Sequence, residues 1–279
     1  MTAPPGPTQP PGTTQPAEAT RLLEAAQLHK AYRLPRTSLF AAAARRRAVD
    51  GVDLSLVSGR HLGIVGESGS GKSTLMRLLL GLERPDAGTV TYRGTRVQPG
   101  RQEWFRREVQ VVLQDPRASL DPRMTVRRIV AEPLECLRVP GDARARVAEV
   151  LTAVGLTPDM ADRYPHEFSG GQRQRIAIAR ALAPGPKVLI GDEPLSALDV
   201  VVRSSVLALL RGLADEFGLT LVLVSHDIGV VQQLCHDVLV MKDGVVVERG
   251  ECARVLSAPE HPYTQALLSA VPQLPAEAL

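Results

Sequence analysis

The sequence predicts an α/β protein built around a largely parallel sheet. Two short β-branched runs, residues 187–190 and 219–224, are apolar without alternation, which is typical of strands covered on both faces. The run that begins at Gly71 has helical spacing instead, because its leucines recur at i, i+3, i+4 and i+7 (Leu75, Leu78, Leu79 and Leu82). Strands that alternate with helices in this way indicate an α/β layer architecture.

The first hundred or so residues contain a tail, two strands and a turn. Residues 1–20 are rich in Pro, Thr and Gly, and we expect a disordered tail because such a segment buries too little surface to offset its ordering entropy. Val52–Leu56 and His61–Val65 alternate between apolar and polar residues and predict strands, separated by a break at Ser58-Gly59. A hairpin signal follows at residues 84–92, RPDAGTVTY.

The rest of the chain continues the alternation. Residues 143–154 have helical periodicity, and so does the segment opened by FSGGQ at Phe168. Near the end, Asp243-Gly244 lies between two Val-rich runs, which predicts a two-residue hairpin.

Composition excludes several function classes. The 33 basic and 30 acidic residues leave a net charge of +3, so we expect no general attraction to nucleic acid or anionic membrane. The three cysteines (Cys136, Cys235 and Cys252) form neither a disulfide framework nor a metal-ligand set, and we interpret them as buried small hydrophobes in a reducing cytoplasm. We expect no secretory signal and no membrane span.

One glycine-rich segment fits a phosphate-binding loop. GESGSGKST follows a predicted strand and opens a predicted helix, as the pattern G-x-x-x-x-G-K-[ST] requires. Backbone N–H groups there can converge on phosphate oxygens, Lys72 can reach the β and γ phosphates, and Ser73 can bind Mg²⁺. The predicted nucleotide-binding residues are Gly66, Glu67, Ser68, Gly69, Ser70, Gly71, Lys72, Ser73 and Thr74.

The segment VLIGDEP ends an apolar strand in two carboxylates. In a P-loop nucleotidase the strand-end carboxylate holds Mg²⁺ through water, and we assign that role to Asp192. Glu193 could then polarise the attacking water as general base. Acidic residues after strands usually serve only loop solvation, but the upstream phosphate loop favours the catalytic interpretation.

Two further polar residues follow predicted strands. His226, in SHD, lies at the carboxyl edge where α/β sheets bind ligands, although a lone histidine is more often a structural hydrogen-bonding group. Gln114 follows the apolar run Val111–Leu113 and could reach a metal-bound water or a γ phosphate.

FSGGQ resembles half of an anion site. Ser169, Gly170 and Gly171 offer exposed N–H groups at a helix start, but without a lysine they could hardly hold a triphosphate alone.

Together these segments resemble the ATP-binding subunits of ABC transporters over about residues 22–271. GESGSGKS matches the Walker A loop, Gln114 the Q-loop, FSGGQ the LSGGQ signature, VLIGDEP the Walker B strand, SALD the D-loop and His226 the switch histidine. The resemblance implies a P-loop NTPase (RecA-like) core, an antiparallel β subdomain (about 22–62 and 88–94) and a helical signature subdomain (about 115–168).

The resemblance also implies a head-to-tail dimer, in which ATP on one Walker A loop is capped by the partner's signature. Residues acting in trans would be Ser169, Gly170, Gly171 and Gln172, with Ser196 and Asp199 in the D-loop. Tyr32 falls where the family places an aromatic ring on adenine, and the alternative for it is a half-exposed strand tyrosine.

A narrower resemblance points to dipeptide, oligopeptide and nickel importers. QDPRASLDPRMTVRRIVAEPL, from Gln114, and HPYTQALLSAVP, residues 261–272, both match segments of those ATPases. Residues 33–47 match an insertion that they often carry, and we interpret its Arg45-Arg46-Arg47 run as a solvated face rather than a lipid or permease contact.

Three departures from the family pattern are visible. Phe168 replaces the usual Leu of the signature, which should be tolerated because that side chain packs away from phosphate. Gly191 precedes Asp192, so we expect a looser strand end. The chain stops at Leu279 without a cysteine-bearing extension, so we expect no iron-sulfur cluster.

The sequence therefore predicts an ATP-binding domain over residues 21–257 and a short importer-type extension over 258–279. The expected function is Mg²⁺-dependent ATP hydrolysis that drives uptake of peptides or a nickel chelate, at the cytoplasmic face of the membrane. Expected partners are a second ABC ATPase, two permeases and a solute-binding protein, with no nucleic acid. The alternatives are a non-transport ABC ATPase, for example in phosphonate breakdown, and a regulatory subunit with little hydrolysis.

Overall fold

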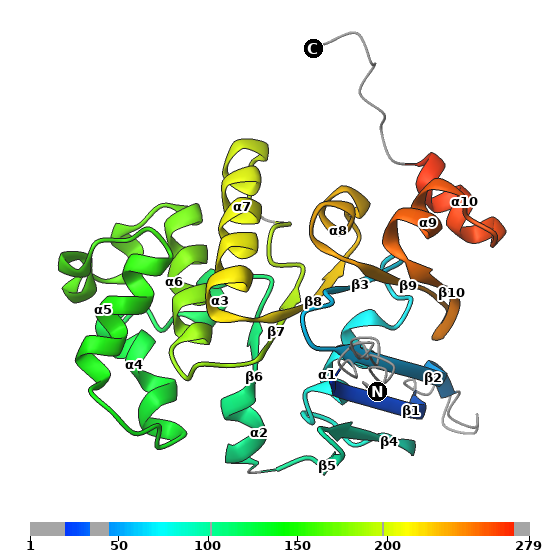
Figure 1. The fold of residues 1–279 in the computed structure, drawn as a ribbon, viewed down its shortest axis with the longest axis horizontal. Helices are drawn as coiled ribbons and strands as arrows, with labels where there is room; N and C mark the ends of the chain where they lie inside the picture. Colours follow the sequence, from blue (N-terminus) through cyan, green and yellow to red (C-terminus); the bar gives the residue numbers. More distant parts are fainter. Residues whose placement is uncertain (1–19, 34–44, 101, 197, 271–279) are drawn as a thin grey trace, which may run out of the picture.

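The computed structural model describes residues 20–33, 45–100, 102–196 and 198–270, which form two sheets with flanking helices (Figure 1). The predictions for residues 1–19, for residues 34–44 of the insertion and for residues 271–279 lie outside the described part of the chain.

The larger sheet carries the strands whose ends bear the predicted catalytic residues. Its strand order is β10-β9-β3-β8-β7-β6, and all neighbours pair in parallel except β9 and β10. The strands are β3 (Leu62–Val65), β6 (Val109–Val112), β7 (Val188–Asp192), β8 (Thr220–Ser225), β9 (Asp237–Lys242) and β10 (Val245–Glu251).

The two β-branched runs form neighbouring buried strands of this sheet, as predicted for strands covered on both faces. Strand β8 is buried along its whole length, and β7 is buried up to its last residue. Because β7 and β8 run parallel and in register, their carboxyl ends meet at one edge of the sheet. That edge is where an α/β sheet presents its ligand-binding residues.

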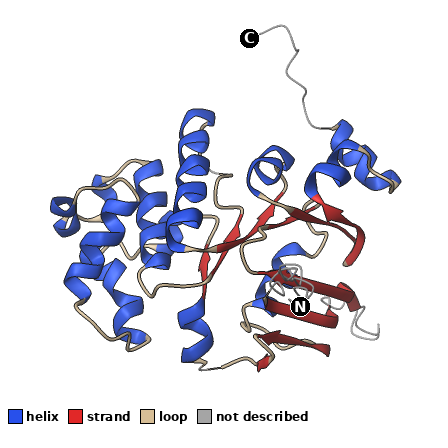
Figure 2. Cartoon of the chain, in the orientation of Figure 1, coloured by secondary structure: helices blue, strands red, loops and turns tan. Residues whose placement is uncertain are grey.

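The smaller sheet is antiparallel, in the order β2-β1-β4-β5 (Figure 2). It consists of β1 (Arg21–Arg33), β2 (Arg45–Val57), β4 (Ala87–Tyr92) and β5 (Thr95–Val97). The hairpin turn predicted at residues 84–92 is misplaced. The turn lies at Arg93-Gly94, between β4 and β5, where both residues have positive φ. The predicted segment instead contains β4 itself, which pairs with β1.

Helix α1 (Lys72–Leu79) lies between the two sheets. Its leucines Leu75, Leu78 and Leu79 are buried among residues of both sheets, which anchors the start of the helix and the loop before it. Leu82 was expected to share this apolar face but is 49% exposed. The helix ends before it, because Gly81 adopts a φ of 60°.

A group of helices on one side of the larger sheet follows β6 (Figure 1). Its core contains Phe168, which is 5% exposed and so packs inward, as expected for the residue that replaces leucine in the signature. The helices are α3 (Pro116–Ser119), α4 (Val126–Cys136), α5 (Ala143–Ala153), η1 (Pro158–Asp162), η2 (Pro165–Glu167), α6 (Gly170–Leu182) and α7 (Val200–Phe217), and the short helix α2 (Glu103–Glu108) directly precedes β6.

The last third of the chain completes the larger sheet and adds three short helices. These are α8 (Ile228–Leu234), α9 (Cys252–Ser257) and α10 (Pro262–Ser269). The Asp243-Gly244 hairpin is confirmed, since β9 and β10 pair across it and both residues have positive φ, as a type I′ turn needs. In the described residues no helix is long and apolar enough to cross a membrane.

Two local expectations are wrong. Cys136 is exposed at the end of α4, whereas Cys235 and Cys252 are buried as predicted. The end of β7 is not loose at Gly191, because the strand pairs on both sides there. A Cβ at Gly191 would lie 2.8 Å from the Cγ of Pro194, so the glycine instead allows close packing.

Candidate functional site

The loop between β3 and α1 has a backbone that only glycine fits at two positions. Gly66 has a φ of 150° and Gly71 a φ of 107°. A Cβ at Gly66 would lie 2.2 Å from the carbonyl oxygen of Met241, and one at Gly71 would lie 2.1 Å from that of Ala48. Since both neighbours are backbone atoms, neither can move aside, and the loop is held close against the sheet.

Lys72 is turned into this loop. Its Nζ donates hydrogen bonds to the carbonyl oxygens of Gly66, at 2.6 Å, and Glu67, at 2.8 Å. Burial lowers the pKa of the lysine, whereas the charges of Glu193, Asp192 and Glu67 raise it. The ammonium group is therefore held inside the loop by carbonyl oxygens that phosphate oxygens could replace.

One open pocket gathers most of the predicted nucleotide site. It contains residues from β1, β2, the loop, α1 and the ends of β6 and β7. Its lining is Tyr32, Arg46, Ala48, Ser68, Gly69, Gly71, Lys72, Ser73, Thr74, Gln114, Asp192 and Glu193. The remaining predicted loop residues, Gly66, Glu67 and Ser70, lie in the same loop without lining the pocket.

Glu193 follows β7 and contacts residues at the ends of the two neighbouring strands, β6 and β8. Its backbone N–H donates to the carbonyl of Val224 on β8, at 2.8 Å, and its φ of 45° is unusual for a residue with a side chain. Its Oε1 lies 3.0 Å from Nδ1 of His226, and its Oε2 accepts a hydrogen bond from Nε2 of Gln114 at 3.3 Å. The structure thus brings together all three residues that were predicted to be catalytic.

The donor set beside Lys72 suits Mg²⁺. Ser73, Gln114 and Asp192 line the same pocket and all supply oxygen atoms, the ligand type that Mg²⁺ prefers. Burial and the neighbouring charge of Glu193 raise the pKa of Asp192 despite the opposing charges of Arg77 and Lys72, and a bound divalent cation would further favour the ionised carboxylate.

The signature segment lies elsewhere in the molecule. Ser169 caps α6, where its side chain accepts from the N–H of Gln172 and the Gln172 side chain accepts from the N–H of Ser169. Ser169 and Gly170 are exposed, and none of residues 169–172 lines the pocket around Lys72. The exposed start of α6 is therefore not part of the site around its own loop.

The D-loop residues contact the elements next to Glu193. The Oγ of Ser196 donates to the carbonyl of Glu193 at 3.0 Å, and Asp199 caps α7 by accepting from the N–H of Val202. These contacts couple the backbone of Glu193 to the start of α7.

Tyr32 and Arg46 form one wall of the pocket. They face each other across the β1–β2 pairing, and the Tyr32 hydroxyl donates to Glu83 at 2.5 Å. Arg46 was interpreted as part of a solvated face, yet its Nη2 donates to the carbonyl of Gly69 at 2.7 Å. The signal that sequence reasoning missed was register, since only the strand pairing places Arg46 opposite Tyr32.

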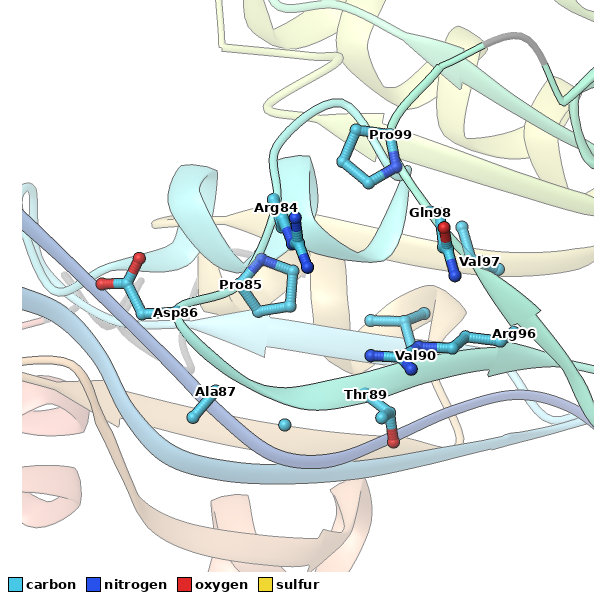
Figure 3. Close-up of a pocket in the computed structure, with 11 residues that line it drawn as sticks. Arg84, Pro85, Asp86, Ala87, Thr89, Val90, Arg96, Val97, Gln98 and Pro99 are labelled. Carbon is cyan, nitrogen blue, oxygen red and sulfur yellow. The ribbon is translucent and has the colours of Figure 1, made fainter.

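A separate hollow lies on the smaller sheet and carries none of the motif residues. It is bordered by the connection from α1 to β4 and by the β4–β5 hairpin, with Pro85, Val90 and Pro99 among its walls (Figure 3). Because it has neither a phosphate loop nor paired carboxylates, we place the candidate active site in the pocket around Lys72.

Comparison with known proteins agrees with this choice. A family model described as ABC transporter matches residues 49–196, and one described as Oligopeptide/dipeptide transporter, C-terminal region, matches residues 247–279. The chain is 51% identical to the oligopeptide transport ATP-binding protein OppD of Mycobacterium tuberculosis, over 87% of this chain and 40% of that protein. The chain thus spans less than half the length of that relative.

Two other relatives show the same likeness. The putative oligopeptide transport ATP-binding protein YkfD of Bacillus subtilis is 48% identical over 84% of this chain and 73% of its own length. The glutathione import ATP-binding protein GsiA of Escherichia coli is 50% identical over 81% and 37%, respectively.

The solved structures share 29% sequence identity with the chain. The ATP-binding cassette MJ0796, in a dimeric post-hydrolysis state bound to ADP and Pi, has a TM-score of 0.72 and covers 83% of this chain and 99% of its own. CbiO1 from Clostridium perfringens, part of the transporter complex cbiONQ, has a TM-score of 0.73 and covers 86% and 92%.

Proposed function

Because the chain belongs to the ATP-binding subunit family of ABC transporters, we propose that it binds and hydrolyses ATP to energise an importer. The observation that carries this proposal is the single pocket that combines the Lys72 loop with Asp192, Glu193 and Gln114, with His226 against Glu193. A phosphate cradle beside paired carboxylates is the combination that phosphoryl transfer to water requires.

ATP would enter with its triphosphate against the loop and its adenine against Tyr32. Lys72 would exchange the carbonyls of Gly66 and Glu67 for phosphate oxygens. Ser73 and Asp192 would hold Mg²⁺, whose chemistry is to neutralise charge that develops on the phosphates.

Glu193 would accept a proton from the attacking water. Its side chain is 20% exposed and lies at the pocket wall, where a water between it and the γ phosphate is within reach. His226 and Gln114 approach it from the two neighbouring strand ends, and both would sense the γ phosphate.

The site would be completed by a second ATPase subunit. Ser169, Gly170, Gly171 and Gln172 lie outside their own pocket, Ser169 and Gly170 are exposed, and a helix start can bind an anion, which supports capping of the partner's nucleotide. The likeness to the dimeric MJ0796 supports the same arrangement. The narrower resemblance favours a related ATPase over a second copy of this chain as that partner.

The transported solute is proposed to be a peptide or a related small solute such as a nickel chelate. The relatives named above are oligopeptide and glutathione import or transport proteins, and the C-terminal family match supports the peptide class. These names do not favour the alternative role in phosphonate breakdown.

Membrane permeases and an extracytoplasmic solute-binding protein are the further proposed partners, with this chain peripheral on the cytoplasmic face. An apolar groove between β6 and α4, lined by Leu80, Leu82, Phe105, Pro133 and Leu137 among others, supports docking of a permease segment. Leu82 is 49% exposed there, which a partner surface would cover.

The test is co-purification of the chain with membrane permeases, followed by reconstitution of the complex in vesicles. ATP-dependent peptide uptake into vesicles, lost in Lys72→Ala together with ATP binding, is the expected result. ATP hydrolysis without any association with permeases would favour the non-transport alternative, and absence of ATP binding by the wild-type protein would contradict the proposal altogether.

A further inference from the structure

The C-terminal extension contacts the phosphate loop directly. The hydroxyl of Tyr263, in the first turn of α10, accepts a hydrogen bond from the backbone N–H of Glu67 at 3.0 Å. The two residues are 196 positions apart in the chain, and Tyr263 is only 8% exposed. The C-terminal family model matches this region, but the proposed mechanism assigns it no role.

Several contacts fix the position of the Tyr263 ring. The Glu248 carboxylate on β10 accepts from the backbone N–H groups of Glu260, at 2.9 Å, and His261, at 3.1 Å. His261 then caps α10, since its Nδ1 accepts from the N–H of Tyr263. The ammonium of Lys242 lies over the ring, 4.9 Å from its centroid. Contacts with β9 and β10 therefore fix the direction of the hydroxyl.

Glu67, which donates to Tyr263, also accepts a hydrogen bond from Lys72. The carbonyl of Glu67 accepts from Nζ of Lys72 at 2.8 Å and from the N–H of Ser70 at 3.2 Å. Glu67 does not line the nucleotide pocket, whereas Ser68, Gly69 and Gly71 do. The bond to Tyr263 thus occupies the N–H of a loop residue that does not line the pocket, and not an N–H of Ser68, Gly69 or Gly71, which do.

We propose that Tyr263 is a positioning residue for the phosphate loop, so that α10 pre-organises the nucleotide site. This inference rests on the proposed function and specifies how that site is controlled. A loop already held in its binding conformation loses less freedom when the nucleotide arrives. Because coupling between two sites is reciprocal, nucleotide in the pocket should in turn hold α10 more firmly on the loop.

The variant Tyr263→Phe removes the hydroxyl and keeps the ring. Loss of one buried hydrogen bond predicts a rise in the Kd for MgATP of about 2- to 10-fold. Turnover at saturating ATP should stay the same, since Tyr263 contacts none of the reacting groups. Gln265→Ala is the matched control, because Gln265 is exposed on the same helix and its side chain donates to the carbonyl of Pro259 in its own segment.

A second variant changes the anchor and not the hydroxyl. Glu248→Gln weakens the two bonds that hold the start of α10 and should raise the Kd in the same direction. If Tyr263→Phe is too unstable to compare, this variant still decides the proposal.

The experiment is amide hydrogen exchange combined with MgATP titration on the full chain. In Tyr263→Phe we expect faster exchange at residues 66–71, unchanged exchange in β3, and loss of the protection that MgATP gives to residues 262–269 in the wild type. Equal Kd values with unchanged exchange at Glu67 would overturn the inference, and so would tighter binding by the variant. A wild-type protein that binds no MgATP would contradict the proposed function instead, and exchange at Glu67 would then decide the tether by itself.

Discussion

The imidazole of His226 faces the carboxylate of Glu193, with Nδ1 3.0 Å from Oε1. The two residues follow neighbouring strands, β7 and β8, and the backbone of Glu193 is itself bonded to Val224 on β8. The side chain of His226 is 59% exposed and that of Glu193 is 20% exposed, and of the two only Glu193 lines the pocket around Lys72. Variants of His226 and of Glu193 can therefore separate the effects of the two side chains on hydrolysis.

Replacing His226 by alanine should slow hydrolysis without preventing ATP binding. The side chain contacts Glu193 and no residue of the Lys72 loop, so we expect a fall in turnover of about 10²-fold with Kd for ATP nearly unchanged. His226→Gln keeps a group that can donate to Glu193 and should lose less. Phosphate release and ATP titration measure the two effects, and an equal loss in both variants would contradict the assigned role.

Ser169→Arg tests the composite site. The bulky charge should block capping of a partner's nucleotide, so one ATP still binds to each chain while hydrolysis is abolished. Asp142→Arg is the matched control, since both residues cap a helix in the same subdomain and each loss costs about 1 kcal/mol of stability. Hydrolysis by Ser169→Arg at the level of Asp142→Arg would contradict action in trans.

Gly66→Ala should damage the phosphate loop. The added methyl group would lie 2.2 Å from a backbone oxygen, at a φ that alanine disfavours, so the loop must shift and ATP affinity should fall at least about tenfold, or 1.4 kcal/mol. Gly212→Ala is the control, because that exposed position in α7 has open space and alanine there should stabilise by up to about 1 kcal/mol. Equal ATP affinities for the two variants would show that the loop tolerates the methyl group.

Stability should fall with acidity because of His61. Burial and the charge of His236 lower the pKa of His61 from 6.5 to about 4, and its Nδ1 accepts the N–H of Leu221. The unfolded chain therefore binds a proton at this residue more readily than the folded protein does. Its contribution to stability is present above about pH 6.5 and is lost as the pH falls toward 4.

Asparagine at position 61 keeps an acceptor that cannot be protonated. His61→Asn should therefore show a smaller loss in the free energy of unfolding between pH 7 and pH 5 than the wild type does. Urea titrations at the two pH values measure this difference, and parallel pH profiles would rule out His61 as the titrating group.

Much of the site could be predicted because it depends on local sequence. The phosphate loop, the strand ends at Glu193 and His226 and the Asp243-Gly244 turn are each specified by neighbouring residues. Parallel strands then bring their carboxyl ends together, so the meeting of Glu193 with His226 follows from topology.

The contacts that were missed depend on register or on long-range packing. Arg46 reaches Gly69 only because β2 pairs with β1 in one register, and Tyr263 reaches Glu67 only because Glu248 anchors α10. Gly191 predicted a weak strand end, but Pro194 packs so close to the glycine that a Cβ would not fit between them. Leu82 fitted the helical period, yet Gly81 ends the helix first.

The most direct test of the account is ATP turnover by Glu193→Gln. The amide keeps the size of the side chain but cannot act as a base, so ATP should bind as in the wild type and dimers should accumulate. Phosphate release should fall by about 10²- to 10⁴-fold. Phosphate release near the wild-type rate, measured under the same conditions with ATP binding intact, would contradict the claim that Glu193 activates the attacking water.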